Sequence, residues 1–161
     1  MRPLTSFLPT RLLGSSAFAA VGRRVFPRSD LALQRLTRGR VSLTAVAGMP
    51  LLLLETTGRR TGELRVTPLT YATQGENFLV AGSNWGQQHQ PAWALNLLAK
   101  PDAVVDLHGE RVPVTAQVLR DADRADAWKL LLKVWPAYDA YVRRIHETSA
   151  REILVFRLER T

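Results

Sequence analysis

A turn rich in arginine, threonine and glycine is the sharpest chemical feature of the sequence. It reads Thr56-Thr57-Gly58-Arg59-Arg60-Thr61-Gly62-Glu63-Leu64-Arg65. Arginine forks suit phosphate or carboxylate oxygens, and two glycines permit a tight backbone with inward N–H groups. The turn is not a P-loop, because the Gly-Lys-Ser/Thr ending is missing and no helix is expected to follow. The residues alone leave two interpretations equally open: an anion-binding turn and a solvated hairpin tip.

A second polar segment, Ser83-Asn84-Trp85-Gly86, follows an expected strand. It lacks the glycine that a nucleophile elbow requires two residues after the serine, and no His–Asp partner is evident. Both absences argue against a hydrolase. Ser83 is a candidate hydrogen-bond donor to a ligand, although a serine that stabilises a turn is equally ordinary.

Two tyrosines, Tyr138 and Tyr141, are three residues apart in an expected helix and therefore project from one face. Two phenols on one face can supply O–H donors to a pocket, but the residues alone favour core aromatics with satisfied hydroxyls. On a shorter expected helix, Trp93 is interpreted as a core residue. Asn96, on the same side, is a candidate to fasten a neighbouring loop.

The composition of the chain excludes several classes of protein. The chain has 161 residues, 46% of them hydrophobic and 22% charged, which is typical of one globular domain. Its longest apolar run, 45–54, is interrupted by Gly48 and Pro50, so it cannot supply the ~20 apolar residues of a spanning helix. There is no cysteine, and the three histidines are far apart, so we expect neither disulfides nor a metal site.

Most of the net charge of +8 belongs to the first 50 residues, which hold eight arginines and a single acid, Asp30. We interpret residues 1–48 as a basic amphipathic helical extension that contacts an anionic membrane peripherally. This places the protein in the cytoplasm or on the inner face of the cell membrane. A helix that packs on the body or on a partner subunit is nearly as well supported. A secretory signal is disfavoured, because Arg11 abuts the apolar run and Arg23–Arg24 follow it.

Residues 49–161 are expected to form a second unit, built on strands. The predicted strands are 51–57, 65–71, 78–82, 104–107, 111–119 and 153–158. Helices are predicted over 91–98, after Asp121 as the capping residue, and from Pro136. Six mostly antiparallel strands with inserted helices indicate an α+β fold, a small β-barrel. Too few β–α–β crossovers are present for a doubly wound sheet.

The order and spacing of these segments resemble one known family. The matching segments are the arginine-rich turn, Arg65 with Pro68–Leu69, Ala81-Gly82-Ser83, Pro91-Ala92-Trp93, Asn96-Leu97, Ala99-Lys100-Pro101 and Pro136-Ala137-Tyr138-Asp139-Ala140-Tyr141. In them the chain resembles the deazaflavin-dependent nitroreductase family, from about Leu51 to Leu158. Members of this family are split β-barrels, similar to FMN-binding barrels, and they use coenzyme F420.

The resemblance implies an oxidoreductase that transfers a hydride from reduced F420 to a quinone or nitroaromatic acceptor. It also implies roles for particular residues. The cofactor would be bound by Arg59, Arg60, Thr61, Arg65, Pro68, Ser83, Asn84, Trp93 and Asn96, with the threonine and arginines on its anionic tail. Tyr141, Tyr138 and Ser83 would be the catalytic donors to a developing oxyanion on the acceptor.

The sequence departs from the family pattern at three places, and these concern the acceptor more than the cofactor. Asn84–Trp85 stands where members often have a basic or glycine residue, Gln90 separates His89 from Pro91, and Trp135 replaces a tyrosine. Two other functions stay open. One is an oxidoreductase of the same fold that binds FMN or haem, and the other is a non-enzymatic basic adaptor for membrane or nucleic acid. Nucleic acid is not expected as a partner of the enzyme.

Overall fold

The computed structural model of the chain describes residues 49–161, so the helical extension predicted over 1–48 lies outside the described part. Its first strand, β1 (Leu51–Thr57), buries every second residue, as a strand with one face on a core must. Six further strands follow, and the total of seven is one more than the sequence predicted. They are β2 (Leu64–Thr70), β3 (Ala72–Gln74), β4 (Asn77–Ala81), β5 (Asp102–Leu107), β6 (Glu110–Val118) and β7 (Val155–Arg160).

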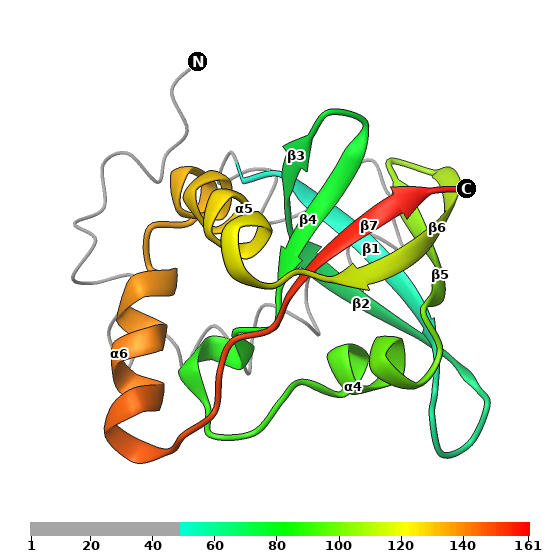
Figure 1. The fold of residues 1–161 in the computed structure, drawn as a ribbon. Coiled ribbons are helices and arrows are strands. Elements are labelled where there is room, and N and C mark those ends of the chain that lie inside the picture. The colour runs from blue at the N-terminus through cyan, green and yellow to red at the C-terminus, as the bar shows by residue number, and fades with distance from the viewer. Residues whose placement is uncertain (1–48) are drawn as a thin grey trace.

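The sheet curls because of one corner in the chain. Its strand order is β2-β1-β5-β6-β7-β4-β3, and all neighbours are antiparallel. β2 and β3 therefore occupy opposite edges, although only Tyr71 separates them in sequence. The sheet must curl to bring the end of one edge strand to the start of the other, which produces the split barrel in Figure 1. The predicted α+β split barrel is confirmed, and the additional strand is the short β3.

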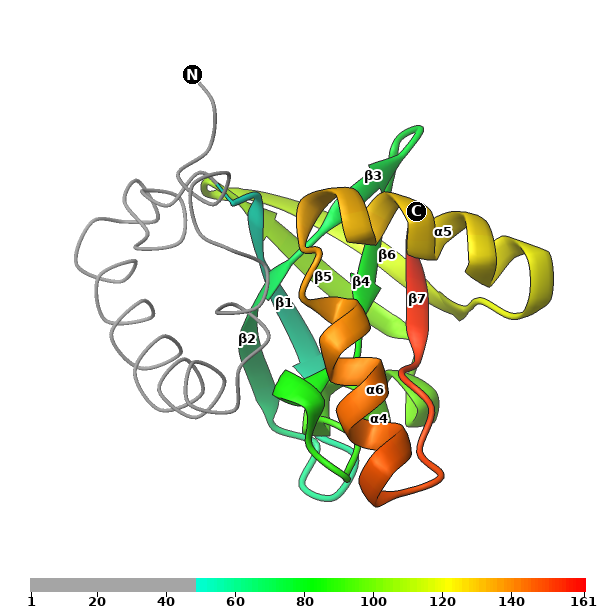
Figure 2. The ribbon, with the colours of Figure 1, turned by 90° about the vertical axis from the view of Figure 1, so that its left-hand side faces the viewer.

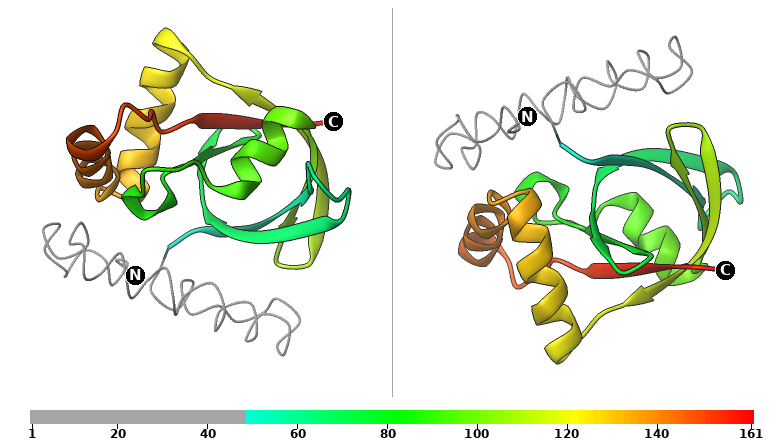
Figure 3. Two further views of the ribbon diagram at one scale, coloured as in Figure 1. Left: turned by 90° about the horizontal axis from the view of Figure 1, so that it is seen from below. Right: turned by 90° about the horizontal axis from the view of Figure 1, so that it is seen from above.

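Three helices and one short turn are inserted between the described strands. They are η2 (Asn84–Gly86), α4 (Ala92–Ala99), α5 (Asp121–Val134) and α6 (Tyr138–Thr148). Figure 3 looks along the barrel and shows α4 lying across it, while α5 and α6 pack together outside the strands. The three predicted helix starts were wrong by one or two residues, and α6 begins two residues after the predicted Pro136. Pro91 is the residue before α4 and has an extended backbone, and Arg120, not Asp121, precedes α5.

The barrel wall is buried on both faces where α5 and α6 cover it. In β4, Phe78 and Val80 point into the barrel core with Trp93, whereas Leu79 and Ala81 join the core beneath the two helices. β4 is consequently apolar on both sides, which explains its continuous hydrophobic sequence. No helix within residues 49–161 is long and apolar enough to cross a bilayer. The segment that leaves β4 lies where the barrel and α6 meet (Figure 2).

Candidate functional site

The turn between β1 and β2 is shaped by its two glycines. The N–H of Gly58 donates to the carbonyl of Glu63, and the N–H of Gly62 donates to the carbonyl of Gly58, both at 2.7 Å. A Cβ atom on Gly58 would lie 3.1 Å from both the Glu63 carbonyl and Thr61 Oγ1. Gly62 has a φ of +73°, in the left-handed region that favours glycine. The glycine spacing read in the sequence is therefore a requirement of this backbone.

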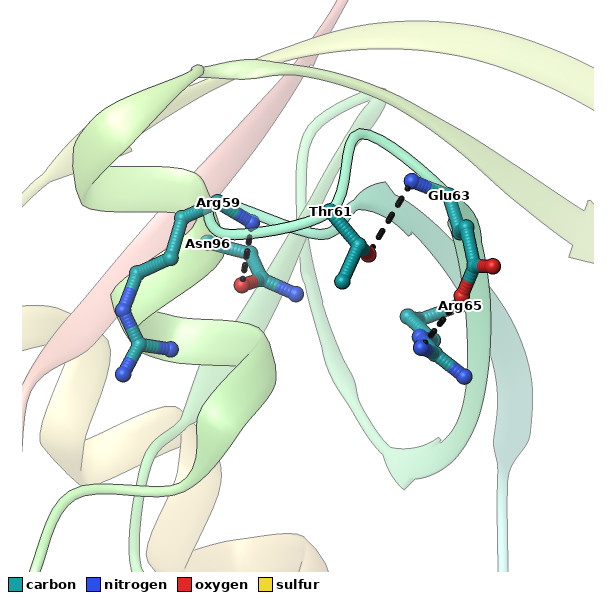
Figure 4. A network of polar contacts seen from close by, with 5 residues as sticks. All are labelled: Arg59, Thr61, Glu63, Arg65 and Asn96. Atoms are coloured by element: carbon teal, nitrogen blue, oxygen red, sulfur yellow. Dashed lines mark hydrogen bonds and ion pairs between the residues drawn. The ribbon is translucent and has the colours of Figure 1, made fainter.

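The arginines of this turn are all exposed to solvent. Arg65 Nη2 forms an ion pair of 2.6 Å with Glu63 Oε2, and the backbone N–H of Glu63 donates to Thr61 Oγ1 at 3.3 Å. Figure 4 shows the side chain of Arg59 extending on the opposite side of Asn96 from Arg65. An exposed pair such as Arg65–Glu63 contributes little to stability, so its partners can exchange for a ligand at little cost. The turn thus presents cationic groups on both of its sides.

Asn96 in α4 fastens this turn to the barrel. Its Oδ1 accepts a hydrogen bond from the Arg59 backbone N–H at 3.1 Å, and its Nδ2 donates to Thr56 Oγ1 at 3.1 Å. Asn96 and Thr56 are the buried polar residues of the described chain, 5% and 1% exposed. Buried polar groups are stabilising only when their hydrogen bonds are satisfied, and both are satisfied here. The expectation that Asn96 fastens a neighbouring loop is confirmed.

The polar segment after β4 has an unusual backbone. Asn84, Trp85 and Gly86 have φ values of 47°, 55° and 75°, so three consecutive residues lie in the left-handed region. A bulky side chain such as tryptophan rarely adopts this region, and each such residue costs about 1–3 kcal/mol. Strain of this kind persists only when the surroundings hold it in place. The Asn84 side chain contributes by donating from Nδ2 to the carbonyl of His89 at 3.1 Å.

Helix α6 packs directly against this strained segment. The rings of Trp85 and Tyr141 lie 6.4 Å apart, and Arg144 Nη1 donates to the Trp85 carbonyl at 3.2 Å. A Cβ atom on Gly86 would lie 3.3 Å from the Cα atom of Tyr141. The structure therefore brings the segment that carries Ser83 together with the helix that carries Tyr141, as the family resemblance implied.

The two tyrosines of α6 are buried and in contact. The rings of Tyr138 and Tyr141 meet edge to face at 6.3 Å. Burial raises the pKa of both phenols above the ordinary value, and for Tyr141 neighbouring Trp135 and Arg144 partly oppose the rise. Within residues 49–161 the Tyr141 hydroxyl has no hydrogen-bond partner at standard distance and angle. The Trp135 indole can only donate, so the proton of the Tyr141 hydroxyl stays without an acceptor.

Two other predicted cofactor residues lie in the barrel wall and core. The Trp93 ring is 6% exposed and packs 5.6 Å from the ring of Phe156. Pro68 is half-buried in β2, opposite Leu53 of β1. Its missing N–H is tolerated there because β2 is an edge strand. Trp93 thus occupies the core position that its residue type favoured, and it supports the barrel from within.

Arg151 is a residue of this region that the sequence did not single out. It lies between α6 and β7, and its guanidinium donates to the carbonyls of Gly82, Ser83 and Gln87. Burial lowers its pKa. Its only local signal was its place in the connection before the closing strand, which does not distinguish it from the other arginines. Within residues 49–161 no cluster of metal-ligating side chains is found.

The arrangement fits an elongated anionic cofactor such as F420. The chemistry of the donor set supports this: exposed guanidinium groups and Thr61 suit phosphate and carboxylate oxygens. The segment containing Ser83 and the phenol of Tyr141 offer polar groups beside aromatic rings, which suit a ring system. A buried hydroxyl proton without an acceptor is the kind of group that a bound molecule satisfies.

Comparisons with known proteins agree with this fit. The profile of the F420H(2)-dependent quinone reductase family matches residues 26–159. An F420H(2)-dependent quinone reductase of Mycobacterium tuberculosis (strain ATCC 25618 / H37Rv) is 37% identical over 102 residues, which are 62% of this chain and 68% of that protein. A solved F420-H2 dependent reductase, FDR-A, is 30% identical with a TM-score of 0.61, over 68% of this chain and 94% of that chain.

A haem-binding protein from Mycobacterium smegmatis shares the fold at 17% identity and a TM-score of 0.53, over 70% of this chain and 46% of that chain. At this sequence identity the similarity shows a shared fold only. The family profile, in contrast, spans most of the chain, including the arginine-rich turn and the helix of the two tyrosines. The chain belongs to the F420H(2)-dependent quinone reductase family.

Proposed function

We propose that this protein oxidises reduced F420 and reduces a quinone to a quinol. The observation that carries the proposal is the family match over residues 26–159, which contains both polar regions of the site. When bound, the reduced deazaflavin supplies a hydride, so the quinone needs one proton in addition. The tasks of the chain are to hold the cofactor, to orient the acceptor and to stabilise charge on its oxygen.

The β1–β2 turn is proposed to bind the anionic tail of F420. Arg59, Arg60 and Arg65 supply guanidinium groups, and Thr61 supplies a hydroxyl. Because Asn96 ties the turn to α4, these groups are displayed on a fixed backbone. A preorganised turn loses less conformational entropy on binding, which favours affinity for the cofactor.

The segment containing Ser83 and Asn84 is proposed to lie beside the deazaflavin ring, with Tyr138 and Tyr141 on the acceptor side. The Tyr141 hydroxyl has a proton with no acceptor and a raised pKa, so it stays protonated at neutral pH. A neutral phenol is a hydrogen-bond donor to an oxygen on which negative charge develops. Ser83 offers a second hydroxyl donor from the neighbouring segment.

The test is the oxidation of purified reduced F420 by the full-length protein, followed by absorbance. The acceptor panel holds benzoquinones, naphthoquinones, nitroaromatic compounds and activated alkenes. We expect turnover with quinones and no need for added FMN. If the protein purifies yellow with bound flavin, or if it neither binds nor oxidises reduced F420, an FMN- or haem-binding oxidoreductase would instead be favoured. Steeply salt-dependent retention on DNA without F420 oxidation would favour a basic adaptor.

A further inference from the structure

The guanidinium of Arg151 donates hydrogen bonds to carbonyl groups before and after the strained residues 84–86. Nη1 and Nη2 donate to the Gly82 carbonyl at 3.1 and 3.0 Å, and Nη2 donates to the Ser83 carbonyl at 2.9 Å. Nε donates to the Gln87 carbonyl at 3.1 Å. Nη1 also donates to Gln90 Oε1 at 3.2 Å and, more loosely, to the neighbouring Glu152 carbonyl at 3.4 Å.

These contacts lie on both sides of the three residues that have a left-handed backbone conformation. Gly82 and Ser83 precede Asn84, and Gln87 follows Gly86, so one planar group fixes both ends of the run. Within residues 49–161 no carboxylate forms an ion pair with Arg151. Among the described residues, its guanidinium donates to backbone and amide oxygens. An arginine presents five donors in a fixed planar arrangement that can bind several separate carbonyls, and the three rotatable donors of a lysine do not reproduce this arrangement.

We propose that Arg151 is a positioning residue of the site: it holds segment 82–90, which contains the strained residues, so that Ser83 is kept beside the reacting groups. This inference rests on the proposed function for its catalytic part. Arg144 holds the same segment from the side of α6, through the Trp85 carbonyl. Arg151 contacts both the beginning and the end of the segment, so its removal should release the backbone of Ser83.

The first readout is independent of the cofactor. Amide hydrogen exchange is followed in peptides covering 82–90 in full-length wild type, Arg151→Met and Arg151→Lys. The matched control is Arg143→Met, because Arg143 is an exposed arginine of α6. We expect exchange in 82–90 to rise about tenfold or more in Arg151→Met, to a smaller degree in Arg151→Lys, and not in the control. Exchange equal to the control in both Arg151 variants would overturn the proposal.

The second readout separates positioning from general stability. At saturating reduced F420 and naphthoquinone, kcat should fall about tenfold or more in Arg151→Met, while the Kd for F420 stays within about threefold. If Arg151 acts through Ser83, the kcat losses of Arg151→Met and Ser83→Ala are not additive in the double variant. Additive losses, or a wild-type kcat in Arg151→Lys, would overturn the catalytic part.

The two arms distinguish this inference from the proposed function. If wild type does not oxidise reduced F420 with any quinone, the proposed function fails, and the exchange measurement alone decides whether Arg151 holds the segment. If Arg151→Met does not fold, Arg151→Lys takes its place in both arms, because it keeps the charge and removes only the fork.

Discussion

The side chain of Asn96 donates from Nδ2 to Thr56 Oγ1 across 3.1 Å, although forty residues separate the two in sequence. Thr56 lies near the end of β1, and Asn96 lies in the helix that crosses the barrel. The other atom of the same amide, Oδ1, accepts the N–H of Arg59 at 3.1 Å. A single amide therefore joins the barrel wall, α4 and the first residue of the cationic sequence.

Replacing Asn96 by leucine is expected to weaken both the fold and the turn. The substitution leaves the Thr56 hydroxyl and the Arg59 N–H without their partner, and an unsatisfied buried group costs about 1–3 kcal/mol. The free energy of unfolding, measured with urea, should fall by about that amount. Affinity for F420 should fall as well, because the turn loses its anchor. The control is Leu98→Ala, an exposed position of the same helix; equal losses in the two variants would show that the amide has no particular role.

Replacing Arg60 by alanine should lower the affinity for F420 about ten- to hundredfold, because one charge-assisted contact to the anionic tail is lost. Turnover at saturating cofactor should change little, since the turn is proposed to bind the tail and not the ring. The measurement is a fluorescence titration with F420, with exposed Arg120→Ala as the control. Unchanged affinity in both Arg59→Ala and Arg60→Ala would remove the tail-binding role.

Replacing Tyr141 by phenylalanine should lower turnover with a quinone about a hundredfold, because only the preorganised donor is lost. The ring packing on Trp85 and Tyr138 is retained, so the protein should stay folded. Tyr138→Phe and Ser83→Ala test the other two candidate donors, and F420 affinity is measured in all three. Full activity in every variant would show that none of the three hydroxyl groups acts as a catalytic donor.

The buried phenols make stability depend on pH in the alkaline range. Burial raises the pKa of Tyr138 and Tyr141 in the folded protein above the value of about 10 in the unfolded chain. Below about pH 10 both states keep their phenolic protons, so the stability contribution is constant there. Above this pH the unfolded chain loses protons first, and the free energy of unfolding falls. Urea unfolding between pH 8 and 11 should show this decline, and Tyr138→Phe should make it shallower. An identical slope in the variant would argue against protected phenols.

Residues 1–48 are proposed to hold the protein on anionic membranes, where a lipid-soluble quinone acceptor would be at hand. The basis is the sequence: Arg11, Arg23, Arg24 and Arg28 interleave with apolar residues at helical spacing. Each basic residue near an anionic surface contributes about 1 kcal/mol. Full-length protein should therefore sediment with anionic liposomes at low salt, and replacing these four arginines by glutamine should abolish sedimentation. Wild type that stays in the supernatant would refute the membrane contact.

Much of the site followed from local sequence, because turn and strand signals depend on neighbouring residues. Gly58 and Gly62 indicated the tight turn, since one has no room for a side chain and the other has a left-handed φ. The apolar segments that open 51–57 and fill 78–82 predicted β1 and β4 nearly to the residue. Helix starts were less accurate, because Asp121 is a good capping residue by type but lies one position inside α5.

What the sequence by itself determined was the order of strands and turns, the cationic character of the β1–β2 turn and the family. What only the tertiary structure decided was which distant residues meet. Nothing local to Arg151 indicates that its guanidinium binds the carbonyls of Gly82 and Ser83, nearly seventy residues earlier. Nothing local to Tyr71 indicates that the strands beside it occupy opposite edges of one sheet. Spacing reports contacts along one helix or strand, whereas these contacts arise when the sheet curls and α6 packs beside it, which depends on the burial of the whole core.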